Sequence, residues 1–185
     1  MNLRTHRAKL ATVTLGTALA GVLAFGTSPA SASASAGAIN GSGTHGNDWE
    51  DEGTLTTTSY AQTNATCLWQ RILSSEGVNR ASGSETDFAI SDIDGIFGKK
   101  TAYASAQLQK RWGLTTDAKI GPKTWTKAST HLKYVSGSTA AGGTLKLKYV
   151  GKTSSFAVTR NTKGFYQFYQ DGGTRVASYK YRTCS

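Results

Sequence analysis

The sequence predicts an α+β protein in which a small three-helix bundle is followed by a small antiparallel four-stranded β-meander. Two observations support this prediction. A turn-like motif beginning at Asp94 returns in altered form at Asp117, and a segment of helical character separates the two copies. Beyond Tyr134, apolar and polar residues instead alternate with a period of two, as in half-buried strands. Helix and strand patterns therefore occupy successive parts of the chain.

Residues 1–36 are predicted to be a secretory signal peptide. A basic start is followed by the largely apolar segment Leu10 to Phe25, and the run from Pro29 to Ala36 offers several A-x-A cleavage sites. The alternative is a membrane anchor, but this apolar segment is shorter than the roughly 20 residues that a spanning helix needs. We therefore expect a secreted, extracellular or cell-wall-associated protein without membrane contact after cleavage.

Residues 37–59 are predicted to form a flexible leader. They are rich in Gly, Ser and Thr, contain an acidic cluster between Asp48 and Glu52, and offer few apolar anchors. His45 lies in this segment without a second potential ligand nearby, so no metal site is expected there. No cofactor is expected from any other part of the sequence.

Residues 60–132 are predicted to form the helical module. Its first helix begins near Cys67 and stops at Gly77, because Gly is favoured just after a helix. The segment Asp94-Gly-Ile-Phe-Gly-Lys-Lys-Thr101 has the composition of a turn that starts a helix, since Asp accepts backbone hydrogen bonds and Thr caps helices. Asp117-Ala-Lys-Ile-Gly-Pro-Lys-Thr124 repeats that pattern.

This arrangement resembles the peptidoglycan-binding domain 1 family, whose members are small three-helix modules of secreted bacterial wall proteins. The family typically shows a D-G-x-x-G-P-x-T turn, an apolar residue and Gln within the next helix, a Gly-Leu pair, and a second such turn ending in Trp. Here the corresponding positions after Thr101 are Leu108, Gln109, Gly113 and Leu114, and the second turn ends at Trp125. The chain departs from the pattern at Lys99, Ser105, Ala118 and Lys119.

The resemblance implies that peptidoglycan is the ligand and that its groove lies among the helices near the two turns. The candidate contacts are Asp94, Phe97, Gln109, Trp112 and Trp125. An alternative stays open for these residues. The three aromatic rings could fill the core of the module, and Asp94 could serve only its turn.

The two cysteines are predicted to form a disulfide between Cys67 and Cys184, because an exported protein with two cysteines normally pairs them. Such a bridge would contribute about 4–5 kcal/mol in the chain-entropy model. The alternative is a nucleophilic cysteine. The wall-remodelling L,D-transpeptidases use one in a His-Gly-Cys-Arg context, which Thr183-Cys184-Ser185 lacks.

Residues 133–185 are predicted to form a basic antiparallel module with strands at 144–150, 155–160, 165–170 and 175–182. One face should carry the apolar side chains of Leu145, Leu147, Tyr149, Phe156 and Val158. The other should carry the basic side chains of Lys146, Lys148 and Arg160. Depending on register, that second face also receives either Tyr166 with Phe168 or Phe165 with Tyr169.

The positive charge of the protein is concentrated in this module. The formal net charge is +10, and residues 133–185 carry nine Lys and Arg against Asp171 alone. Lys146 and Lys148 are therefore candidate contacts for anionic wall polymers or peptidoglycan carboxylates. The alternatives are a protein partner, or lysines that only solvate the sheet. No specific nucleic-acid partner is expected, because an exported protein does not meet nucleic acid in the cell. We also expect a monomer.

No catalytic motif is recognised in the sequence. It lacks G-x-S-x-G, Ser-x-x-Lys and clustered zinc ligands, and nothing favours an acidic pair such as Glu76 with Asp92. The sequence therefore predicts a secreted, non-catalytic peptidoglycan-binding protein. One alternative is a small secreted inhibitor or effector that binds a protein through its basic sheet. A weaker alternative is a wall hydrolase with an unrecognised site.

Overall fold

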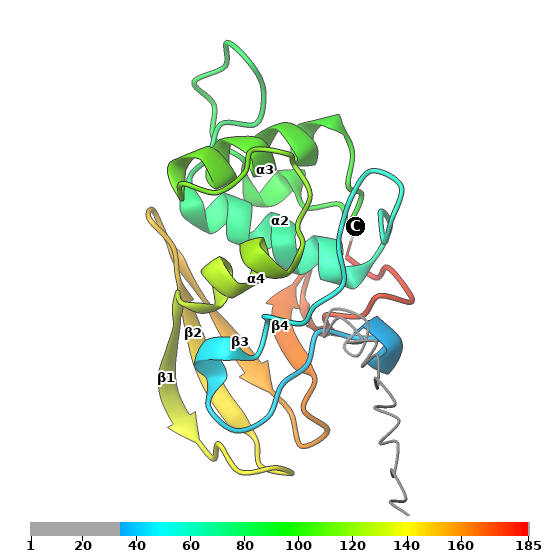
Figure 1. The fold of residues 1–185 in the computed structure, drawn as a ribbon, viewed down its shortest axis with the longest axis vertical. Coiled ribbons are helices and arrows are strands. Elements are labelled where there is room, and N and C mark those ends of the chain that lie inside the picture. The colour runs from blue at the N-terminus through cyan, green and yellow to red at the C-terminus, as the bar shows by residue number, and fades with distance from the viewer. Residues whose placement is uncertain (1–33, 185) are drawn as a thin grey trace, which may run out of the picture.

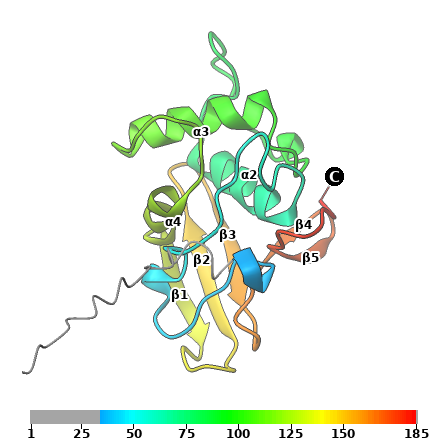
Figure 2. The same ribbon diagram turned by 45° about the vertical axis from the view of Figure 1, so that its right-hand side comes forward.

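The computed structural model describes residues 34–184, so the predicted signal peptide lies outside the described residues except for residues 34–36. Three helices gather at one end of the molecule and an antiparallel sheet forms the other (Figures 1 and 2). The helices are α2 (Asn64–Glu76), α3 (Lys99–Arg111) and α4 (Pro122–Ser129), with short 3₁₀ turns η1 (His45–Asn47) and η2 (Ile90–Asp92). The α+β class and the three-helix module agree with the sequence-based prediction.

The helix boundaries follow local capping chemistry. The side chain of Thr63 accepts a hydrogen bond from the Thr66 amide at the start of α2, and Gly77 ends that helix in the left-handed region at φ 55°. Pro122 begins α4, where its missing N–H is no loss. None of the helices within residues 34–184 is long and apolar enough to cross a membrane.

The sheet has five strands rather than the four predicted. In spatial order they are β1 (Leu132–Gly137), β2 (Leu145–Val150), β3 (Ser155–Arg160), β4 (Tyr166–Gln170) and β5 (Gly173–Val176), and each pairs antiparallel with the next. The sequence pattern missed β1 because only its first residue, Leu132, is buried, which leaves no alternation to detect.

The last strand is also shorter than predicted, because the chain leaves the sheet after Val176. The carbonyl oxygens of Ser178 and Tyr181 instead accept hydrogen bonds from the Ala65 and Asn64 amides at the start of α2. The C-terminal segment thus runs beside α2 (Figure 1). The predicted disulfide between Cys67 and Cys184 is present and fixes this arrangement, with a Cα–Cα distance of 6.4 Å.

The two faces of the sheet differ as predicted, with one error. Leu145, Leu147 and Tyr149 are buried, whereas the intervening Lys146 and Lys148 are exposed. Arg160 was expected beside these lysines, but it is only 2% exposed on the inner face. It pairs with Leu145 across the strands and shares the alternation of Phe156 and Val158 along β3, so the outward assignment was wrong.

The prediction of a flexible leader at residues 37–59 is contradicted for most of its length. Ile39, Trp49 and Leu55 are fully buried in the core. Two of its carboxylates are also buried and bonded to distant partners. Asp48 pairs with Arg160 and accepts a hydrogen bond from the Tyr166 hydroxyl. Composition was misleading because three well-spaced apolar residues suffice to anchor this segment, and the acidic groups find partners elsewhere in the chain.

Leader, helices and sheet share one hydrophobic core. Trp49 of the leader makes edge contacts with Trp125 of α4 and with Tyr166 of β4, at ring-centroid distances of 5.8 and 5.2 Å. Trp125 in turn contacts Trp69 of α2 at 5.4 Å. Because these rings connect all three parts, residues 60–132 and 133–185 pack as one unit around a common interior.

Candidate ligand-binding groove

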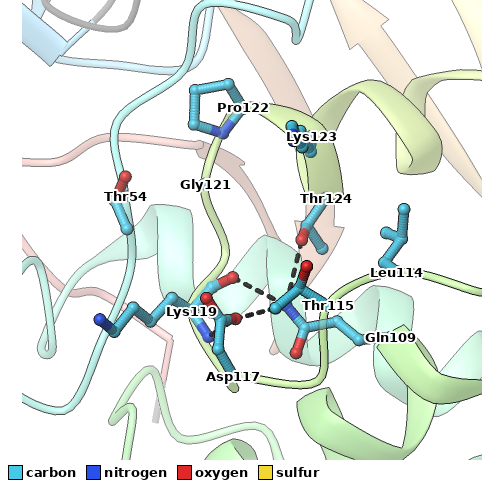
Figure 3. Close-up of a pocket in the computed structure, with 10 residues that line it drawn as sticks. All are labelled: Thr54, Gln109, Leu114, Thr115, Asp117, Lys119, Gly121, Pro122, Lys123 and Thr124. Carbon is cyan, nitrogen blue, oxygen red and sulfur yellow. Dashed lines mark hydrogen bonds between the residues drawn. The ribbon is translucent and has the colours of Figure 1, made fainter.

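A buried glutamine organises the second turn, which runs from Asp117 to Thr124. The Gln109 side-chain Nε2 donates to Asp117 Oδ1 at 3.0 Å, to the Lys119 carbonyl at 2.9 Å and to Thr124 Oγ1 at 3.2 Å. Its Oε1 accepts from the Ala118 amide at 2.8 Å. The side chain is therefore fully used in holding the turn against α3 and α4 (Figure 3).

The first turn repeats this scheme with Gln70 of α2. Its Nε2 donates to Asp94 Oδ1 at 2.8 Å, to the Ile96 carbonyl at 3.1 Å and to Thr101 Oγ1 at 2.9 Å. Asp94 also accepts from the Ile96 amide, as Asp117 does from the Lys119 amide. The sequence repeat is thus a structural repeat in which the glutamine makes equivalent hydrogen bonds.

The residue after each Asp adopts a left-handed backbone conformation. Gly95 has φ 68°, and Ala118, at the equivalent position, has φ 57°. Glycine adopts this region without steric cost, whereas alanine does not. The second turn therefore holds a strained residue where the first has the glycine that the family pattern shows.

The two turns differ in what lies against them. At the first turn, Arg182 of the C-terminal segment donates to the Asp94 carbonyl oxygen at 2.8 Å. A Cβ atom added at Gly95 would lie 2.8 Å from both Arg182 Cγ and Cys67 Sγ. The C-terminal segment and its disulfide therefore pack against Gly95, while Asp94 and Ile96 on either side of it stay exposed.

The second turn instead borders an open groove of about 480 Å³ (Figure 3). One wall comes from α3 and the turn itself, and the leader supplies Thr54 on the other side. The leader is held there by two backbone hydrogen bonds between Leu55 and Ile120, at 3.1 and 3.0 Å. The lining consists of Thr54, Gln109, Leu114, Thr115, Asp117, Lys119, Gly121, Pro122, Lys123 and Thr124.

The groove combines hydrogen-bonding, ionic and apolar groups. Asp117, Lys119 and Lys123 are exposed, and neither lysine pairs with a carboxylate of residues 34–184. Thr54 and Thr115 add hydroxyls, and Leu114 and Pro122 add apolar surface. Such a lining can bind a hydroxyl- or amide-bearing ligand that also carries a carboxylate.

The candidate residues from the sequence do not form one site. Gln109 lines the groove, but its polar atoms hold the turn. Phe97 and Trp125 are 2% and 0% exposed, and they fill the core as the alternative interpretation proposed. Asp94 is exposed at the first turn, outside the groove lining, while Trp112 is half-buried and packs against Trp69 and His131.

Lys146 and Lys148 lie on the outer face of the sheet rather than in the groove lining. The repeated Asp117-to-Thr124 motif indicated where the groove would be, and Lys119 and Lys123 belong to that motif. The wall supplied by Thr54 had no sequence signal, because the leader was expected to be flexible. Gln70 was also missed, although it follows Trp69 in α2 much as Gln109 follows Leu108 in α3.

A second polar cluster lies between the helices and the sheet. Glu76 is buried and bonded to Arg111 and to the Tyr149 hydroxyl at 3.0 Å, and His131 Nδ1 lies 3.3 Å from its Oε1. Burial, followed by the charge and hydrogen bond of Glu76, raises the pKa of Tyr149 well above its ordinary value. The carboxylate thus joins α2 to β2.

Asp92, considered above as an acidic partner for Glu76, has cations of its own. It bonds to Lys100 at 2.6 Å and to Arg80 at 3.5 Å. Burial opposes its ionisation, but these contacts and the Ala89 amide outweigh that effect and hold the pKa of Asp92 below its usual value. Within residues 34–184, no group of three or more His, Cys, Asp or Glu is placed to hold a metal ion.

The helical segment matches a known protein family. The family described as "Putative peptidoglycan binding domain" matches residues 67–127, which run from α2 through both turns into α4. This match confirms the resemblance inferred from the repeated turn. Neither the comparison with curated proteins nor that with solved structures gave a match. The leader and the sheet lie outside the matched residues.

Proposed function

We propose that this protein is a secreted, non-catalytic binder of cell-wall peptidoglycan and that the groove at the second turn holds the ligand. One observation carries the proposal. The family-matched segment contains two equivalent turns, and the second borders an open groove, whereas Arg182 and the disulfide pack against Gly95 of the first. The expected location is the extracellular space or the wall, which the disulfide supports.

The chemistry of the groove suits this ligand. Peptidoglycan offers sugar hydroxyls, N-acetyl amides and peptide carboxylates. Thr54 and Thr115 can hydrogen-bond the first two, and Asp117 can accept from an amide N–H. Lys119 and Lys123 can pair with a carboxylate, while Leu114 offers an apolar contact to a sugar ring or methyl group.

Binding to purified sacculi tests this proposal. The substitution Thr115→Trp places a large side chain at an exposed groove position, and Thr162→Trp makes the same change in an exposed turn of the sheet. We expect Thr115→Trp to weaken binding at least tenfold and Thr162→Trp to leave it unchanged, with both melting like the parent. Equal binding by Thr115→Trp and the parent would show that the groove does not hold the ligand.

The absence of catalysis is part of the proposal and needs its own measurement. Glu76 and Asp92 are each engaged by cations, and the groove lining contains one carboxylate, Asp117. An acid–base hydrolase of glycan needs two carboxyl groups facing the scissile bond. We expect no release of soluble fragments from labelled sacculi and no clearing on wall-containing gels.

A further inference from the structure

The outer face of the sheet is a second surface that the proposed groove does not use. Strand β2 alternates strictly between buried and exposed residues, and the buried side faces the core shared with leader and helices. Lys146 and Lys148 point outward together, and by the same alternation Tyr169 of β4 does so too, with 62% of its surface exposed. The register adds Lys133 of β1, directly opposite Lys148.

Three lysines therefore lie close together on two adjacent strands. Residues directly opposite in an antiparallel pair have Cβ atoms roughly 5 Å apart, so Lys133 and Lys148 begin side by side, and the Lys133 ammonium reaches the Thr130 carbonyl oxygen at 3.4 Å. Lys146 lies two residues along β2, at about 7 Å. Like charges placed directly opposite are destabilising, so folding alone does not favour this arrangement.

The positive charge on this face is not neutralised by the protein. No carboxylate of residues 34–184 forms an ion pair with Lys133, Lys146 or Lys148. The one acidic residue of the sheet region, Asp171, lies in the turn between β4 and β5. On the inner face, by contrast, the buried cation Arg160 is paired with Asp48. The outer face is thus complementary to an anion from outside the chain.

We propose that the outer face binds a phosphodiester polymer of the wall. A flexible polymer with one fixed negative charge per short repeat can pair with several lysines at the same time when these are spaced about 5 and 7 Å apart. Lysine is a compact point charge, whereas a single carboxylate is typically recognised by the bidentate fork of arginine. Ala157, directly opposite Lys148, and the exposed ring of Tyr169 leave apolar surface for the carbon backbone between phosphates.

This surface is independent of the groove, so the two contacts would act together on one wall. Two weak contacts on a single polymer network reinforce each other through the high effective concentration of the second site. The part of the binding affinity that the lysines contribute should fall with added salt, since it depends on releasing counterions from the polyanion.

Binding of soluble poly(glycerol phosphate) by the secreted chain tests the proposal. The outer-face variant is Lys133→Gln with Lys146→Gln and Lys148→Gln. The control variant, Lys99→Gln with Lys163→Gln and Lys180→Gln, loses the same charge at exposed lysines elsewhere. We expect at least a tenfold loss at low salt for the outer-face variant and less than a twofold loss for the control. If both variants lost the same binding affinity, the net charge of the protein would explain the loss, and the proposal would be overturned.

Competitors and stripped walls separate the remaining alternatives. Poly-glutamate or duplex DNA that binds as tightly as poly(glycerol phosphate) would overturn the phosphodiester assignment in favour of another polyanion. On sacculi freed of phosphodiester polymers by hydrofluoric acid, the outer-face variant should bind like the parent, and on untreated sacculi it should bind more weakly. Thr115→Trp should lose binding on the stripped walls, so failure of the groove and failure of the outer face give different results.

Discussion

Gln109 donates a hydrogen bond from Nε2 to Oδ1 of Asp117 over 3.0 Å, and this contact is the centre of the turn that borders the groove. The same side chain reaches the Ala118 amide, the Lys119 carbonyl and Thr124, so one buried amide fixes the shape of the loop. Because Gln70 does the same for the first turn, the two turns have equivalent supports, and the second of them borders the groove.

Removing this support should destabilise the protein strongly. Gln109→Ala removes the partner of the buried Thr124 hydroxyl and of the partly buried Ala118 amide and Lys119 carbonyl, and a buried group without a partner costs about 1–3 kcal/mol. We expect a loss of about 2–4 kcal/mol in the free energy of unfolding by urea. Gln107→Ala, two residues earlier and half-buried, is the matched control and should cost far less. Similar losses for both would show that the amide network contributes little.

Relieving the strain at Ala118 should stabilise the protein. Its φ of 57° lies in the left-handed region, where alanine is disfavoured by about 1–2 kcal/mol and glycine is not. Because glycine also gains more freedom on unfolding, we expect a net gain of roughly 0.5–1 kcal/mol for Ala118→Gly. The reciprocal change Gly95→Ala should be destabilising, because its Cβ would approach Arg182 and Cys67. A lower melting temperature for Ala118→Gly would contradict this interpretation.

The disulfide should contribute substantially to stability. Cys67 and Cys184 are 117 residues apart, and a loop of this size corresponds to about 4–5 kcal/mol in the chain-entropy model. Titration of the unfolded, unreduced protein should find no free thiol. The double substitution Cys67→Ser with Cys184→Ser should lower the midpoint of urea unfolding accordingly. Two reactive thiols in freshly secreted protein would show that the bridge does not form.

Stability should also fall steeply at alkaline pH. Three of the eight tyrosines, Tyr149, Tyr166 and Tyr179, have pKa values raised above the ordinary value, first by burial and then by the carboxylates of Glu76, Asp48 and Glu52. Their stabilisation is complete below about pH 10 and is lost above it, because only the unfolded state then releases these protons. Each group contributes a slope of about 1.4 kcal/mol per pH unit.

Absorbance at 295 nm checks this expectation. The three hydroxyls should ionise only as the protein unfolds, whereas Tyr166→Phe should lose one protected phenol and flatten the decline of stability with pH. The ionisation of all eight tyrosines while the fold is intact would contradict the assignment of these three as buried.

Much of the helical part could be predicted from the sequence because its signals are local. A turn motif and a stop glycine act over a few residues, so α2, α3 and α4 lie close to where these signals place them. The capping role expected of the threonine that closes each turn was wrong, because Thr101 and Thr124 lie inside helices that follow Gly98 and Gly121. The disulfide was also predictable, since it depends on cysteine count and export. The position of the groove near a turn followed from the repeat.

What could not be predicted depends on contacts between distant segments. The leader is ordered because Trp49 packs against Trp125 and Tyr166, and because Asp48 meets Arg160, which is more than a hundred residues away. No local pattern reports such pairings. For the same reason the difference between the two turns could not be predicted, since Arg182, which packs against the first, lies 87 residues after Gly95.

The most direct test of the central claim is a map of backbone amide shifts as the secreted protein is titrated with soluble peptidoglycan fragments. The account predicts that the largest changes fall at Leu114, Thr115, Lys119 and Gly121, with a further change at Thr54 across the groove. The amides of Gly95 and Ile96, in the first turn against which Arg182 packs, should stay unchanged. Shifts confined to the first turn or to the sheet, with none at residues 114–124, would contradict the account.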